Sequence, residues 1–108
     1  MNDDYLPWKI LSATVVVGTE TENWNLAIPA DEEDSARCFT LEIYFATPFT
    51  TPPVVHLGLT GFDIDQCSSG RIKVVTEAVT TDRFLAKIST WRSSRVYSVE
   101  FNWLAVGA

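Results

Sequence analysis

The sequence predicts an all-β fold, an antiparallel β-sandwich of short strands. Two observations favour this class. Apolar and polar residues alternate with a period of two along several stretches, and groups of Gly, Pro, Ser, Thr and Asp separate these stretches. No stretch of helical length shows a 3.6-residue apolar period. Short alternating strands joined by turn signals are typical of a sandwich.

Length and composition indicate one domain, residues 1–108, with a single core. The chain has 108 residues, of which 46% are hydrophobic and 20% charged, as is ordinary for a folded protein. The 8 basic and 14 acidic residues give a net charge of -6. This balance argues against nucleic acid and anionic membranes as partners, since both require a basic surface.

The ends and the cysteines say little about the compartment. No apolar run approaches the roughly 20 residues that span a bilayer, so membrane insertion is not expected. Residues 1–10 lack the basic and apolar regions of an export signal. The expected setting is therefore the cytoplasm, non-classical export, or excision from a larger secreted protein. Cys38 and Cys67 either form one disulfide, worth about 3 to 4 kcal/mol, or stay reduced.

The first part of the chain predicts one strand and two polar connections. Residues 8–17 are rich in β-branched side chains and form the first strand, which ends at Gly18. A polar connection over residues 20–25 follows, in which we expect Trp24 to pack the loop onto the sandwich. The acidic run at 31–34 reads as a solvated loop or as a rim of hydrogen-bond acceptors.

The middle of the chain predicts two more strands. Residues 38–45 alternate, with Phe39, Leu41, Ile43 and Phe45 facing inward and Thr40, Glu42 and Tyr44 facing outward. The proline-rich segment 47–53 is a stiff turn that leads into the apolar strand 54–59. That strand contains His56, the one histidine, which we expect to be packed or hydrogen-bonded. The loop at 63–70 begins with Asp-x-Asp but lacks the further oxygen ligands and the glycine of a calcium loop.

A hairpin and a last strand complete the prediction. The inward faces of the hairpin arms carry Ile72, Val74, Thr76 and Ala78, and then Phe84, Ala86 and Ile88. The last strand, 97–107, turns Tyr97, Val99, Phe101, Trp103 and Ala105 inward. A turn centred on Thr81 gives a symmetric register in which the pairs are Val74 with Ile88, Ile72 with Thr90, Ala78 with Phe84 and Arg71 with Trp91.

The pair at the open end of the hairpin suggests a ligand platform. In this register Arg71 and Trp91 lie roughly 5 Å apart on the face away from the core. An exposed indole offers a flat apolar surface, and a neighbouring guanidinium offers forked donors. The alternative is a tryptophan that covers a sheet edge or an oligomer contact.

Catalytic signatures are missing from the sequence. A Ser/His/Asp or Cys/His arrangement could be built only through His56. No His/Cys cluster has zinc spacing, and no glycine-rich loop could hold a phosphate. Paired carboxylates can be chosen among the acids, but a small sandwich has little room for an enclosed cleft. We therefore expect neither an enzyme nor a bound metal or cofactor.

Residues 41–107 resemble the H-type lectins, a family that includes a snail agglutinin and the C-terminal domain of the discoidins. The similar stretches are IYFATPFTTPPVV, FDIDQ before Arg71, FLAKISTW and RVYSVEFNWLAVG. Before Thr40 the resemblance is weaker and rests on Trp24, Pro29 and Asp34. It implies a six-stranded antiparallel β-sandwich that assembles as a parallel homotrimer and binds glycans with terminal galactose or N-acetylgalactosamine between subunits.

The resemblance also implies a set of sugar-binding residues. One subunit would contribute Arg71, Trp91, Tyr97 and Arg92, the last in place of a histidine of the snail lectin. The neighbouring subunit would contribute Asp34, with Glu32 and Glu33 in place of a glycine and an arginine. These replacements change the hydrogen-bond donors around the sugar ring. The resemblance therefore implies sugar binding more firmly than it implies which sugar is bound.

Two further implications concern assembly. Some family members form hexamers, and the snail members carry cysteines where this chain has Thr50 and Ile88, so their disulfides are absent here. The alternative function is a structural or adhesive trimerisation domain of a larger assembly, without a functional sugar site.

Overall fold

The computed structural model describes residues 8–28, 36–67 and 69–108, and within them the chain forms six β-strands. The strands are β1 (Lys9–Gly18), β2 (Ala36–Tyr44), β3 (Val54–Ile64), β4 (Lys73–Glu77), β5 (Arg83–Trp91) and β6 (Val96–Gly107). The predicted strands are all present. The third strand continues to Ile64, five residues beyond its predicted end at 59, through a register shift between Leu59 and Gly61.

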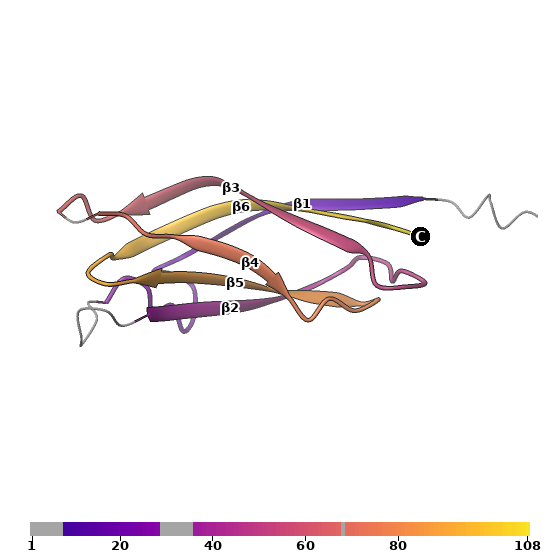
Figure 1. Ribbon diagram of the computed structural model, residues 1–108, viewed down its shortest axis with the longest axis horizontal. Helices are drawn as coiled ribbons and strands as arrows, with labels where there is room; N and C mark the ends of the chain where they lie inside the picture. The colour runs from indigo at the N-terminus through magenta and orange to yellow at the C-terminus, as the bar shows by residue number, and fades with distance from the viewer. Residues whose placement is uncertain (1–7, 29–35, 68) are drawn as a thin grey trace, which may run out of the picture.

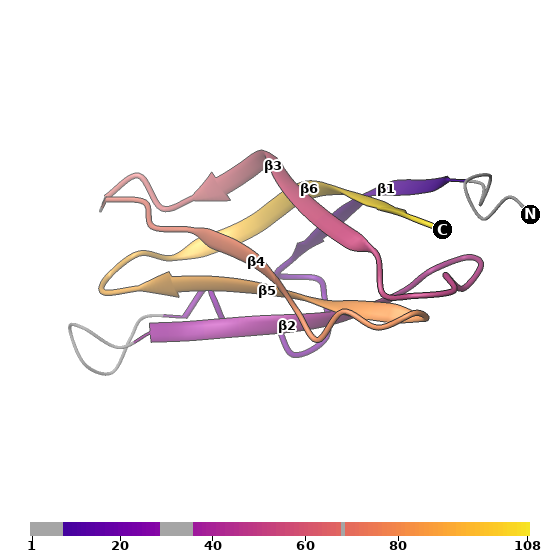
Figure 2. The same ribbon diagram turned by 45° about the vertical axis from the view of Figure 1, so that its right-hand side comes forward.

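The strands form two antiparallel three-stranded sheets that pack face to face. One sheet has the order β1-β6-β3 and the other the order β2-β5-β4. Figures 1 and 2 show the sheets as two layers, with the β3–β4 connection and the β5–β6 turn at the same end, on the left. The all-β antiparallel sandwich expected from the alternation is confirmed.

The core lies between β5 and β6, the central strands of the two sheets. Phe84, Ala86 and Ile88 of β5 are fully buried, as the alternation predicted. On β6 the buried residues are Val96, Val99, Phe101, Trp103 and Ala105. The ring of Phe45 lies 5.7 Å from that of Phe84 and 5.8 Å from that of Trp103, between centroids. These rings join the two sheets near the end of β2.

The predicted hairpin register is confirmed over the length of β4. The pairs run from Lys73 with Ser89 to Glu77 with Leu85 and include Val74 with Ile88. The outer predicted pairs are not part of the ladder. Ala78 has a φ of 51°, in the left-handed region, so the strand ends before it can pair with Phe84. At the other end β4 begins only at Lys73, so neither Ile72 nor Arg71 has a ladder partner.

Two side-chain predictions have opposite outcomes. Trp24 packs against the core, donates from Nε1 to the Val96 carbonyl at 2.9 Å, and has its ring 5.1 Å from that of Phe39. His56, expected to be packed or hydrogen-bonded, is exposed instead. The strand β3 is half-buried, with Val55 and Leu57 facing the core, so the alternation places His56 on the opposite face.

The question of the cysteines is answered by their positions. Cys38 lies on β2 and Cys67 in the β3–β4 connection, and both are exposed and unbonded.

The described residues include no helix that is long and apolar enough to span a membrane.

The contrasting burial of two tryptophans gives a test of the core. Trp103→Ala removes a side chain that is 6% exposed and in contact with two aromatic rings, so we expect a loss of about 3 to 5 kcal/mol in the free energy of unfolding. Trp91→Ala, at a half-buried position at the end of β5, should cost clearly less. Urea denaturation of both variants measures the difference, and a larger loss for Trp91→Ala would contradict the assignment.

Candidate functional site

Residues 92–95, between β5 and β6, form with Trp91 at the end of β5 a tight turn at one end of the sandwich. The Ser94 backbone N–H donates to the Trp91 carbonyl at 3.4 Å and closes the turn. Arg92 within it has a φ of 59°, a left-handed conformation that is uncommon for a residue other than glycine. A turn that contains such a residue needs contacts from its surroundings to hold it.

Arg37 supplies the first of these contacts. Its guanidinium donates from Nη1 to the Arg92 carbonyl at 3.0 Å and from Nη2 to the Ser94 carbonyl. Burial lowers the pKa of Arg37 from its ordinary value, but a guanidinium stays charged at neutral pH. A fixed positive charge from β2 thus binds two carbonyl groups of the turn, those of Arg92 and Ser94.

Ser94 connects the turn to Arg71. Its side chain is 1% exposed, and its Oγ accepts a hydrogen bond from the Arg71 backbone N–H at 3.0 Å. The Arg71 guanidinium donates from Nη1 to the Ser69 carbonyl at 3.2 Å. Arg71 is therefore joined to the turn that carries Trp91 and Arg92, although through Ser94 and not through the predicted ladder pair.

Two further connections meet at this end. The Val96 N–H donates to the Leu26 carbonyl at 2.8 Å, and the Asp65 N–H donates to the Arg95 carbonyl at 2.9 Å. The Arg95 side chain donates from Nε to the Ala27 carbonyl at 3.1 Å. The turn is thereby held by segments from three different parts of the chain, which fixes the backbone on which the candidate residues are placed.

Positive charge is concentrated here. Arg37 and Arg71 contact the turn, Arg92 is part of it, and Arg95 is its last residue. These are four of the 8 basic residues of a chain whose net charge is -6. The β5–β6 end therefore offers several hydrogen-bond donors to a polar ligand or to an acidic segment.

Trp91 lies at the edge of this group. It is half-buried and is the last residue of β5, where its register partner on β2 is Ala36. Alanine ends at Cβ, so the neighbouring strand covers little of the indole. An accessible indole beside guanidinium groups suits a ligand with both apolar and hydroxyl-bearing surfaces.

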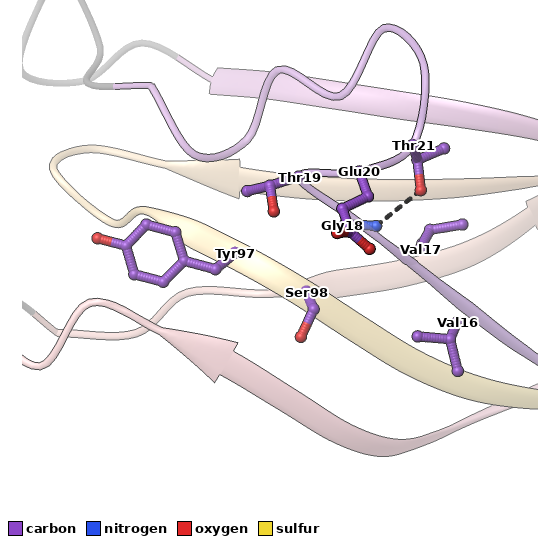
Figure 3. A pocket seen from close by; sticks show the side chains of 8 residues that line it. All are labelled: Val16, Val17, Gly18, Thr19, Glu20, Thr21, Tyr97 and Ser98. Carbon is purple, nitrogen blue, oxygen red and sulfur yellow. Dashed lines mark hydrogen bonds between the residues drawn. The ribbon is translucent and has the colours of Figure 1, made fainter.

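Tyr97 lies in a separate hollow next to β1. The hollow has a volume of about 310 Å³ and is lined by Val16, Val17, Gly18, Thr19, Glu20, Thr21, Tyr97 and Ser98 (Figure 3). The Tyr97 carbonyl accepts from the Thr19 N–H at 3.0 Å, and a Cβ on Gly18 would lie 2.5 Å from the same oxygen. Only glycine allows this approach. Among the described residues, no hydrogen bond or ring contact joins Tyr97 to Arg71 or Trp91.

The acidic part of the expected site, Glu32, Glu33 and Asp34, lies outside the described residues. The stretch that contains it joins the sheet at Ala36, the register partner of Trp91. Of the expected residues, the structure thus brings Arg71, Trp91 and Arg92 to one turn and places Tyr97 in the neighbouring hollow.

The residues that hold this site were not identified from the sequence. Arg37 lies two residues before Phe39, so the inward alternation of β2, continued backward, places an arginine on the inner face. An inward arginine requires hydrogen-bond acceptors, so the alternation of β2 could have identified Arg37 as a residue that binds buried carbonyl groups. Ser94 carried no such signal, because a serine in a turn is ordinary. Among the described residues, no group of three or more His, Cys, Asp or Glu side chains could hold a metal ion.

An antiparallel sandwich with a tryptophan and several arginines around one terminal turn offers an apolar platform beside forked hydrogen-bond donors. Comparison with known families identifies the domain. The H-type lectin domain matches residues 40–106, which is more than half of the chain. The chain therefore belongs to the H-type lectin domain family.

Similar proteins extend this result. A protein of Fuscovulum blasticum named "ATP synthase subunits region ORF 7" is 33% identical over 72 residues, covering 67% of this chain and 63% of that protein. Recombinant discoidin II of Dictyostelium discoideum has the same fold, with a TM-score of 0.76 at 21% identity over 95% of this chain and 38% of discoidin II. Wild-type discoidin II gives a TM-score of 0.75 at the same identity. The chain thus spans less than two thirds of each relative.

The bond between Ser94 and Arg71 can be tested directly. Ser94→Ala leaves the Arg71 N–H without its acceptor, which should lower the free energy of unfolding by about 1 to 3 kcal/mol and speed hydrogen exchange at the Arg71 amide. Ser89→Ala, on the outer face of β5, is the matched control and should change stability by less than about 0.5 kcal/mol. Unchanged exchange at Arg71 in Ser94→Ala would show that the bond does not hold this segment.

Proposed function

We propose that the protein is a lectin that binds glycans with terminal galactose or N-acetylgalactosamine at sites between the subunits of a parallel homotrimer. The observation that carries the proposal is the β5–β6 turn, where Arg71 is bound to Ser94 and Trp91 and Arg92 belong to the same turn. Family membership supports carbohydrate as the ligand class. The choice of sugar and the trimer rest on the family resemblance.

The turn offers complementary chemistry to a pyranose. The Trp91 indole would cover the apolar patch of the ring, while Arg71 and Arg92 would donate to its hydroxyl groups. Asp34 of the neighbouring subunit would accept from vicinal hydroxyls, and Tyr97 would wall the site. Each such contact contributes roughly 1 to 2 kcal/mol net, so a single site is expected to be weak.

Charge is compatible with an inter-subunit arrangement. Four arginines lie at the turn, and one of them, Arg95, has its Nη1 3.9 Å from Asp65 Oδ2. The acidic run that includes Glu32 and Glu33 would complement this surface from a neighbouring copy. Three weak sites at one end of a trimer would act together on a glycan-bearing surface, with a gain in avidity that suits adhesion or agglutination.

Trp91→Ala tests the platform. We expect it to abolish calorimetrically detected binding of galactose and N-acetylgalactosamine, because the apolar face of the ring loses its partner, while the domain stays folded. Tyr44→Ala is the matched control: Tyr44 is an aromatic residue of the same β2-β5-β4 sheet, 63% exposed and at the far end of β2. Its removal should leave binding unchanged. A wild-type chain that gives no response to any galactose-type sugar at high millimolar concentration would favour a structural trimerisation domain instead.

Mixed trimers test the inter-subunit site. Asp34→Ala and Arg71→Ala chains should each fail to bind sugar as homotrimers. When the two are unfolded together and refolded, some interfaces pair an intact Asp34 with an intact Arg71, so part of the binding should return. Because the acidic stretch joins β2 opposite Trp91, a site within one chain is the clear competing arrangement. Mixed trimers that form without any recovery of binding would establish it.

A further inference from the structure

The hollow that contains Tyr97 lies where the end of β1 meets the start of β6 (Figure 3). A Cβ on Gly18 would lie 2.5 Å from the Tyr97 carbonyl oxygen and 2.9 Å from Ser98 Cβ, so the two strands approach closely at this point. Gly18 thus adds no side chain to the open space, whose volume is about 310 Å³. A hollow of this size lies at the lower end of the range of small-molecule sites and is large enough for a single sugar unit.

Backbone hydrogen bonds hold the rim of this hollow in place. The Thr19 N–H donates to the Tyr97 carbonyl at 3.0 Å and ties the segment after β1 to β6. Gly18 and Thr21 bind each other twice, because the Gly18 N–H donates to Thr21 Oγ1 at 2.9 Å and the Thr21 N–H donates to the Gly18 carbonyl at 2.7 Å. The Trp24 N–H then donates to the Thr21 carbonyl at 3.1 Å. A rim that is formed in advance costs a ligand little ordering on binding.

The side chains around the hollow suit a neutral group that carries hydroxyls. Glu20 is exposed, and within the described part of the chain its carboxylate has neither a hydrogen bond nor an ion pair. Thr19 and Ser98 add hydroxyl groups, which can donate or accept. None of the described lining residues is lysine or arginine. A carboxylate without a neighbouring cation accepts well from sugar hydroxyls, and it repels a ligand that carries a carboxylate or a sulfate.

Tyr97 connects the hollow to the β5–β6 turn. It is the third residue after Ser94, the residue that holds Arg71 at the turn. In Figure 3 the Tyr97 ring points away from the other labelled side chains, toward the end of the sandwich where β5 turns into β6. The ring therefore lies between the hollow and the turn, where it can contact ligand groups on both sides.

We propose that this hollow is a second sugar subsite. It takes the neutral sugar unit that is joined to the terminal galactose-type residue at the β5–β6 turn. Glu20 accepts hydrogen bonds from the hydroxyls of this second unit, and Tyr97 contacts both units. The inference rests on the proposed function and deepens it, because it makes the ligand an oligosaccharide and excludes a sialylated or sulfated unit from the second position.

Calorimetric titration of the full chain with sugars of one and two units tests the subsite. The probes are the methyl glycosides of galactose and N-acetylgalactosamine, and then lactose, N-acetyllactosamine, melibiose and N,N′-diacetyllactosediamine. We expect at least one disaccharide to bind about tenfold more tightly than the methyl glycoside of its terminal sugar, because one charge-assisted hydrogen bond is enough for this gain.

Two glutamates form a matched pair for assigning the gain. Glu20→Ala removes the carboxylate that lines the hollow and should lower the affinity for that disaccharide about tenfold, with the affinity for the methyl glycoside unchanged. Glu22 is exposed in the same segment and does not line the hollow, so Glu22→Ala should change neither affinity. Equal losses in the two variants would assign the effect to net charge and overturn the subsite.

A variant that fills the hollow gives an independent test. Thr19 is exposed, and its contact with Tyr97 is made by the backbone, so Thr19→Trp should keep the fold while its indole occupies the open space. We expect the affinity for the disaccharide to fall to that for the methyl glycoside. Thermal melts of the variants confirm that they are folded, and a disaccharide gain that persists in Thr19→Trp would contradict the proposal.

The same titrations keep the subsite and the lectin function apart. A wild-type chain that binds the methyl glycosides but gains nothing from any second sugar unit would refute the subsite and leave the lectin function standing. A wild-type chain that binds none of the probes would refute the lectin function and, with it, the subsite.

Discussion

The structure depends on the burial of β5 against β6. Each is the central strand of its sheet, and each turns an unbroken apolar stripe inward, so the stripes meet along the length of the sandwich. Phe84 and Trp103 contact at 5.4 Å between ring centroids, and Phe101 and Ile88 are fully buried in the same layer. Because both strands are flanked by hydrogen-bonded neighbours, their position fixes that of the other four.

The candidate site is positioned by the same two strands, because the turn that joins them carries Trp91 and Arg92. What holds the turn is polar. Arg37 occupies an inward position that would otherwise be apolar, and it satisfies two turn carbonyls, while Ser94 satisfies the Arg71 N–H. Buried polar groups of this kind stabilise only when each finds a partner, which ties the exact course of the turn to these residues.

Alternation predicted the strands, their inward faces and the hairpin register well, since a period of two leaves little freedom once one face must be buried. It failed where burial depends on tertiary context. His56 stands in an apolar run that looked fully buried, yet β3 is an edge strand whose outer face is open. Likewise the Arg71–Trp91 ladder pair assumed that β4 continues, whereas Ser94, a residue distant from Arg71 in the chain, captures the Arg71 N–H. Such competition between local and distant partners cannot be read from a pattern.

Assembly and ligand binding are coupled if the sugar lies between subunits. The arginine-rich turn is held within one chain, so it needs no partner to form, whereas Asp34 would come from a neighbouring copy. A ligand that contacts both then binds the trimer and not the monomer. By mass action it stabilises the trimer, by about 2.7 kcal/mol per site at a hundredfold excess over its dissociation constant. Weak sites would therefore strengthen the same assembly that gives them avidity.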